Sequence, residues 1–160
     1  MKKNKRGFLL GEETLKMVVA VICIGFLVYL LVAVYFNVTG EQKLKEATLS
    51  LNDKVLPEII KLNENSEFSS AELHVPNPAG WIILSFVSAE EKPNSCAGQN
   101  CICICEEVFP DLFDWQINRC DKKGICGNVV NLAKFGRIKI EKTGIQIMIQ
   151  KINGEIQITK

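Results

Sequence analysis

The sequence predicts an α+β protein in which a long N-terminal helix precedes a small antiparallel β-sheet domain with disulfides. Three features of the 160-residue chain indicate this. After a basic leader at residues 1–16, residues 17–36 form an uncharged apolar run, and residues 37–66 then repeat apolar side chains every three or four positions. Residues 67–160 carry short β-rich segments and six of the seven cysteines, and we expect one extracytoplasmic domain there.

The apolar run predicts a transmembrane helix. Met17 to Phe36 contains no charged residue, Pro, Asn or Gln. At about 1.5 Å of rise per residue, such a helix spans roughly 30 Å, the thickness of the hydrocarbon core of a bilayer. A removable secretory signal has a shorter core followed by a small-x-small cleavage site, and no such site follows Phe36. A buried core helix of this length would normally show a polar face.

The charges that flank this run predict its orientation. Residues 37–42, on the far side, contain no Lys or Arg. The positive-inside rule then places the N-terminus in the cytoplasm and residues 37–160 outside, as a single-pass protein of the cell membrane in contact with lipid. The positive charges that precede the run are Lys2, Lys3, Lys5, Arg6 and Lys16.

Residues 37–66 have the periodicity of an amphipathic helix. Thr39 is a plausible N-cap, Gly40 permits a bend after the membrane segment, and Pro57 is expected to kink the helix or end its first part. We expect the apolar stripe to pack on its own domain, although neighbouring copies are an alternative partner. The stripe consists of Leu44, Ala47, Leu51, Val55, Ile59 and Leu62.

Four to six strands are expected in one sheet packed on this helix. Residues 81–87, 101–108 and 137–141 are short β-rich runs. Around Asn153-Gly154, two alternating segments predict a hairpin with a type I′ turn. The isoleucines expected to share faces of these two strands are Ile145, Ile147 and Ile149 on the first and Ile156 and Ile158 on the second.

The remaining segments of this region are expected to be less regular. Residues 63–80 are polar and contain prolines, which is typical of a linker, and His74 is expected to be a solvated loop residue there. Residues 109–124 are expected to be irregular with one short helical turn. Residues 125–135 are ambiguous between strand and helix.

Six cysteines outside the apolar run predict a disulfide framework. An even number of cysteines on the oxidising side of a membrane is typical of disulfide bonding. Cys23 lies inside the apolar run and is expected to be a small hydrophobic residue. The six are Cys96, Cys101, Cys103, Cys105, Cys120 and Cys126.

Three of these cysteines alternate with isoleucines. In an extended segment, Cys101, Cys103 and Cys105 share one face, with Ile102 and Ile104 on the other. Cys101 and Cys105 are then ~13 Å apart, too far to pair with each other. Each is therefore expected to pair with a cysteine of another segment. The available partners are Cys96, Cys120 and Cys126.

Metal and redox roles for these cysteines are the alternatives. Their spacing is not a common zinc or iron–sulfur pattern, and three cysteines on one strand face cannot all reach one ion without distortion. No Cys-x-x-Cys is present, although a redox enzyme normally carries one at a helix start. We therefore expect structural disulfides, with no metal and no cofactor.

Other chemistry has little support in the sequence. The formal net charge of +1 does not predict a nucleic-acid partner. There is no phosphate-binding loop, no serine-hydrolase elbow and no zinc-protease motif, and His74 is the single histidine. Trp81 and Trp115 are expected in the core rather than on a binding surface. The expected role is therefore not enzymatic.

The segment from Arg6 to Glu12, RGFLLGE, resembles the class III signal of type IV pilins and their archaeal relatives. The resemblance implies that a prepilin-type peptidase cuts after Gly7, so that Phe8 becomes the first residue. It also implies that Glu12, now fifth, pairs with the free amine of a neighbouring subunit. The chain would then be a pilin-like subunit that self-assembles through its N-terminal helix into a cell-surface filament or secretion-type assembly.

Two other functions remain open. Glu12 and Lys16 are four residues apart and could pair on one helix face at the cytoplasmic surface. The chain would then be an ordinary signal-anchored protein whose disulfide-stapled exterior domain is a binding module. A third possibility is an enzyme of thiol or metal type at the outer membrane face.

Overall fold

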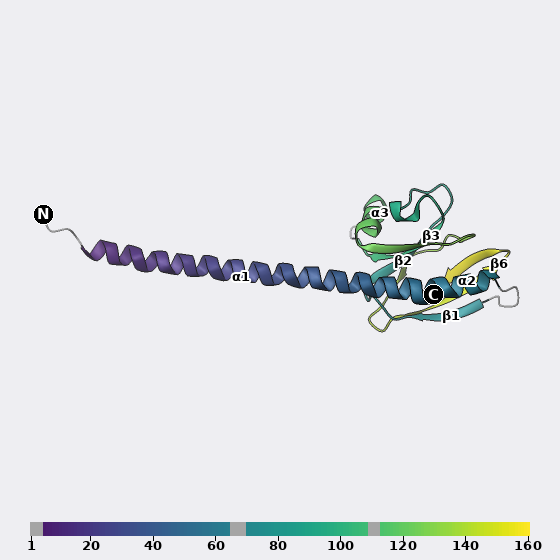
Figure 1. Cartoon of the computed structure of the whole chain (residues 1–160), viewed down its shortest axis with the longest axis horizontal. Coiled ribbons are helices and arrows are strands. Elements are labelled where there is room, and N and C mark those ends of the chain that lie inside the picture. Colours follow the sequence, from purple (N-terminus) through teal and green to yellow (C-terminus); the bar gives the residue numbers. More distant parts are fainter. Residues whose placement is uncertain (1–4, 65–69, 109–112) are drawn as a thin grey trace. The chain divides into compact units, whose positions relative to one another are not determined.

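The computed structural model describes residues 5–64, 70–108 and 113–160, of which residues 5–13 and 113–114 are described by their backbone alone. The chain divides into two compact units, Met1–Gly40 and Glu41–Lys160. The described residues of the first unit are helical, and the second combines the end of that helix with two β-sheets and a short helix (Figure 1). The α+β fold with disulfides is confirmed.

Helix α1 (Lys5–Ser50) continues through the position where we expected a cap and a bend. The Thr39 hydroxyl donates a hydrogen bond to the Tyr35 carbonyl at 2.8 Å, one turn back, instead of capping a new helix. Threonine can satisfy its hydroxyl inside a helix in this way, and Gly40 costs a helix only about 1 kcal/mol. The expected cap and bend are therefore wrong: the change from apolar to amphipathic at residue 37 changes the side chains and not the backbone.

Pro57 is admitted by a local change of helical pitch. A π-helical segment, η1 (Leu51–Val55), lies between α1 and α2 (Leu56–Glu64). The Leu56 amide donates to the Leu51 carbonyl, five residues back. Because proline has no N–H and its ring clashes with the carbonyl four residues before it, a wider turn directly before Pro57 relieves the conflict.

The predicted apolar stripe faces the core of its own domain. Its last five members are at most 2% exposed, and Leu44 packs against them half-buried. The segment η1 contacts strands β1 (Ser70–Val75) and β4 (Gly124–Asn128), and α2 contacts β6 (Ile145–Ile152). The five buried members are Ala47, Leu51, Val55, Ile59 and Leu62.

Within the described residues the strands form two antiparallel sheets rather than the single sheet we expected. The first has the order β1-β6-β7, with β7 at Glu155–Thr159. The second has the order β4-β3-β2-β5, and its strands β2, β3 and β5 span Trp81–Phe86, Cys101–Glu106 and Ile138–Lys139.

Two segments that we expected to be irregular are ordered. Strand β1 lies in the predicted linker and pairs with β6 from Ser70↔Gln150 to Val75↔Ile145, so exposed His74 is a strand residue. Ser, Ala, Glu and His signal a strand weakly, and pairing with β6 supplies the stability that composition does not. Helix α3 (Phe113–Lys122) runs for ten residues where one turn was expected.

The predicted hairpin is confirmed. Asn153 and Gly154 have φ angles of 52° and 83°, and a type I′ turn requires positive φ at both positions. The five isoleucines of β6 and β7 that were expected to share faces are all buried in the same core.

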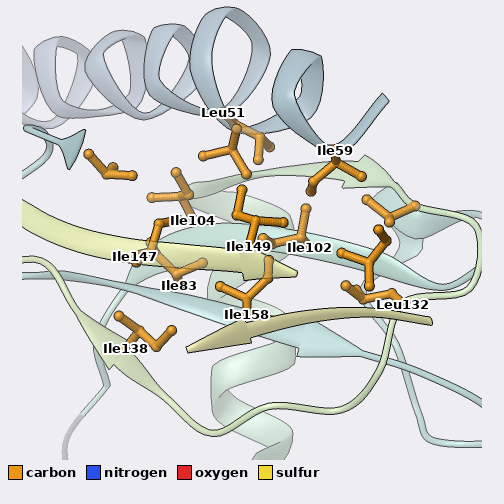
Figure 2. Packing of buried hydrophobic residues seen from close by; sticks show 14 of the residues in the cluster. Leu51, Ile59, Ile83, Ile102, Ile104, Leu132, Ile138, Ile147, Ile149 and Ile158 are labelled. Carbon is orange, nitrogen blue, oxygen red and sulfur yellow. The ribbon is translucent and has the colours of Figure 1, made fainter. Parts of the chain in front are cut away.

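The main core lies between the helical stripe and the two sheets. In Figure 2, Leu51 and Ile59 point from the helix toward Ile102 and Ile104 of one sheet and Ile149 of the other. A second buried cluster lies on the opposite face of β3. It contains five of the six disulfide-bonded cysteines of the chain. The sheet that contains β3 is therefore buried on both faces, which accounts for the uninterrupted burial of residues 101–105.

Candidate functional site

The N-terminal motif belongs to α1, but its side chains lie outside the described residues. Gly7, Phe8 and Glu12 fall within the helical backbone. The pairing of Glu12, whether with a neighbouring amine or with Lys16, therefore stays a prediction.

Beyond this motif, α1 exposes apolar side chains on every side. Among the described residues, this is one helix long and apolar enough to cross a membrane, and none of its most apolar stretch is buried. Val21, Ile22 and Leu27, on different sides of the helix, are all more than half exposed. Cys23 is exposed there with a free thiol and takes no part in the disulfide framework.

Strand β3 presents its cysteines in a column. Alternation along the strand sends Ile102 and Ile104 into the main core and Cys101, Cys103 and Cys105 into the second cluster, as predicted. Helix α3 covers this cluster, since it contacts both β3 and β4.

Each strand cysteine bonds to a different segment, as the count of partners predicted. Cys96–Cys101 closes a short loop with a separation of 5, and Cys105–Cys120 attaches α3 to the strand with a separation of 15. Cys103–Cys126, with a separation of 23, joins directly opposed positions on β3 and β4.

Two of these disulfides touch each other. The Cys103 sulfur lies 3.9 Å from the Cys96 sulfur and 3.9 Å from the Cys101 sulfur. With Cys126, these form a quartet whose Sγ atoms all lie within 4.8 Å of one another. Tetrathiolate metal sites need sulfurs this close, but a disulfide sulfur carries no thiolate to offer a metal.

Residues around the cysteines hold this region in place. The Gln116 side chain is 1% exposed; its Oε1 accepts from the Val108 amide at 3.2 Å and its Nε2 donates to the Glu106 carbonyl at 3.0 Å. The Asp121 carboxylate accepts from the Ser95 amide at 3.2 Å, which ties the segment that carries Cys96 to the end of α3. Sequence reasoning missed Gln116 and Asp121. The one available signal was their spacing around Cys120 on a helix we had expected to be a single turn.

The second tryptophan is not in the core. Trp81 is 3% exposed, as expected, whereas Trp115 is 56% exposed. Trp115 borders an open hollow of about 270 Å³ whose rim also includes Arg119 and Lys122.

Comparison with known protein families, with curated proteins and with solved structures gave no match to this chain. Functional inference therefore starts from two physical features. One is the exposed apolar length of α1, and the other is the cysteine-rich cluster beneath α3.

Proposed function

We propose that the chain is a membrane-anchored, non-enzymatic structural protein, a pilin-like subunit of a cell-surface filament or secretion-type assembly. The observation that carries the proposal is the contrast along the N-terminal helix. The large apolar side chains of α1 from Leu15 to Val38 are all exposed, whereas the stripe from Ala47 onward is buried in its own domain. The first segment needs an apolar environment and the second already has one.

A lipid bilayer and a bundle of neighbouring helices can both supply that environment. The apolar helix anchors the subunit, with its N-terminus in the cytoplasm and its β domain outside. After processing it becomes the packed stem of an assembly. Glu12 supports this second role, because a carboxylate in an apolar bundle is tolerated only with a partner, and a new N-terminal amine at Phe8 supplies one.

Trp115 favours one alternative function. An exposed aromatic ring beside Arg119 and Lys122 is a suitable surface for a partner. In this alternative α1 is a permanent anchor and the exterior domain is a binding module.

Processing separates the two functions. We expect the protein purified from its native membrane to begin at Phe8, as measured by intact mass and N-terminal sequencing. Gly7→Val should retain the leader, because the peptidase needs a small residue before the cut, and Gly11→Ala is the matched control that should be processed normally. A mature protein that begins at Met1 or Lys2 would contradict the assembly proposal and leave the anchored binding module.

The assembly role of Glu12 has its own test. Glu12→Ala should leave membrane insertion intact, because it removes a charge from an apolar helix, but should abolish filaments seen by electron microscopy of cell-surface preparations. Glu13→Ala is the matched control and should assemble normally. Wild-type amounts of filament from Glu12→Ala would contradict the assembly role of Glu12.

A further inference from the structure

We propose that the sulfur quartet is a thiol–disulfide relay in which Cys126 receives an external dithiol and Cys103 passes the exchange to the buried Cys96–Cys101 disulfide. The relay lies wholly within the unit Glu41–Lys160. It does not depend on the processing or assembly of α1, so the two proposals fail separately.

Burial gives the relay its direction. Cys126 is half-buried on β4, which is an edge strand of its sheet, whereas Cys96, Cys101 and Cys103 are 0% exposed. An external thiolate therefore reaches the Cys103–Cys126 disulfide at the Cys126 sulfur. Attack there makes Cys103 the leaving group, since exchange passes through a mixed disulfide with the sulfur that is attacked.

The released Cys103 thiolate is already beside its next target. Its sulfur is 3.9 Å from both sulfurs of the Cys96–Cys101 disulfide, in van der Waals contact. Contact of this kind replaces the diffusional encounter that limits exchange between separate molecules.

The chemistry balances without an added oxidant. An external dithiol, as its thiolate, attacks Cys126 and forms a mixed disulfide while Cys103 leaves as a thiolate. Cys103 attacks Cys96, so the Cys96–Cys103 bond forms, the Cys96–Cys101 bond breaks, and Cys101 takes up a proton. The second thiol of the external dithiol then releases Cys126 and closes a disulfide in the reductant. Two electrons have entered, and Cys101 and Cys126 are the reduced pair.

Strand geometry selects Cys96 over Cys101 as the sulfur attacked. Cys101 and Cys103 are two residues apart on one extended strand, a spacing of about 6.6 Å, near the upper limit for the Cα atoms of a disulfide. Cys96 lies instead on η2 (Asn94–Cys96), a short segment outside the sheets. A Cys96–Cys103 bond therefore requires less distortion of strand β3 than a Cys101–Cys103 bond.

The third disulfide supplies a matched control. Cys105 and Cys120 are buried like Cys96, Cys101 and Cys103, at 0% and 1% exposure, but neither belongs to the sulfur quartet. A thiol freed at Cys105 has no disulfide of the quartet in contact with it, so it should stay where it is freed.

The test compares two variants of the full chain in detergent, both in a Cys23→Ser background that removes the exposed free thiol. Cys126→Ala frees Cys103, and Cys120→Ala frees Cys105. After equilibration at mildly alkaline pH and an acid quench, the free thiol is labelled under denaturing conditions and mapped by peptide mass spectrometry. In Cys126→Ala, at least about a tenth of the label should be found on Cys101, as expected when two pairings are within tenfold in population. In Cys120→Ala the label should be confined to Cys105.

Label confined to Cys103 in Cys126→Ala, with Cys96–Cys101 intact, would overturn the relay. If that variant does not fold, the wild-type pairing decides the question. A limiting amount of dithiol should release Cys126 together with Cys101 while Cys105–Cys120 stays oxidised. Release of Cys103 with Cys126, and of no quartet member beyond them, would also overturn the relay.

Discussion

Leu51→Ala is expected to lower the free energy of unfolding of the unit Glu41–Lys160 by about 2–5 kcal/mol. Leu51 is 0% exposed and lies at the start of η1, where the helical stripe packs against the core that it shares with the two sheets (Figure 2). Truncation removes buried methyl groups and leaves a cavity under a π-helical segment held in place by Pro57. Urea unfolding of the full chain in detergent, followed by the fluorescence of buried Trp81, measures the effect.

Leu49→Ala is the matched control, because it makes the same change two residues away on the same helix. Leu49 is 50% exposed, so this change should alter stability by no more than about 0.5 kcal/mol. Equal losses of unfolding free energy for the two variants would mean that the stripe does not pack on its own domain. Packing of the stripe against neighbouring copies would then be the alternative.

The elements predicted correctly from sequence are those whose side chains repeat with a clear period. The stripe from Ala47 to Leu62 repeats at three or four residues, and alternation in β3 separates cysteines from isoleucines. Asn153 and Gly154 both adopt the positive φ that a type I′ turn requires, and Asn and Gly are the residue types that do so most readily. In each case the local sequence pattern and the tertiary packing favour the same structure.

The elements missed are those that depend on contacts outside the element itself. Strand β1 is ordered by pairing with β6, about seventy-five residues later by the register Ser70↔Gln150 and Val75↔Ile145. Helix α3 is held by the Cys105–Cys120 disulfide and by Gln116, which bonds to two backbone groups before the helix. The division into two sheets likewise follows from long-range pairing, which no short window of sequence contains.

The cysteine site was predictable in part. Alternation placed three cysteines on one face and left three partners for them, which predicts three bridges. Which partner bonds to which cysteine depends on where β4 and α3 pack, and the contact of Cys103 with the Cys96–Cys101 disulfide depends on the path of η2. These are tertiary facts that the spacing of cysteines does not encode.

Removal of the Cys105–Cys120 disulfide by the double change to Ala is expected to cost about 3 kcal/mol of stability. The bond closes a loop with a separation of 15, so its loss frees the unfolded chain, and it also frees α3 from β3 in the folded state. Amide hydrogen exchange of α3 should therefore accelerate more than that of β6, whose contacts with β1 and β7 do not involve this disulfide.

The double change of Cys96 and Cys101 to Ala is the matched control for this loss. All four cysteines are at most 1% exposed, so the two variants lose similar buried sulfur. The separation of Cys96 and Cys101 is only 5, and the chain-entropy relation gives about 2 kcal/mol for such a loop. A larger loss from the short loop than from the long one would show that contacts within the sulfur quartet, rather than loop closure, dominate what these disulfides contribute. That result would make the quartet the main stabilising element of the region that α3 covers.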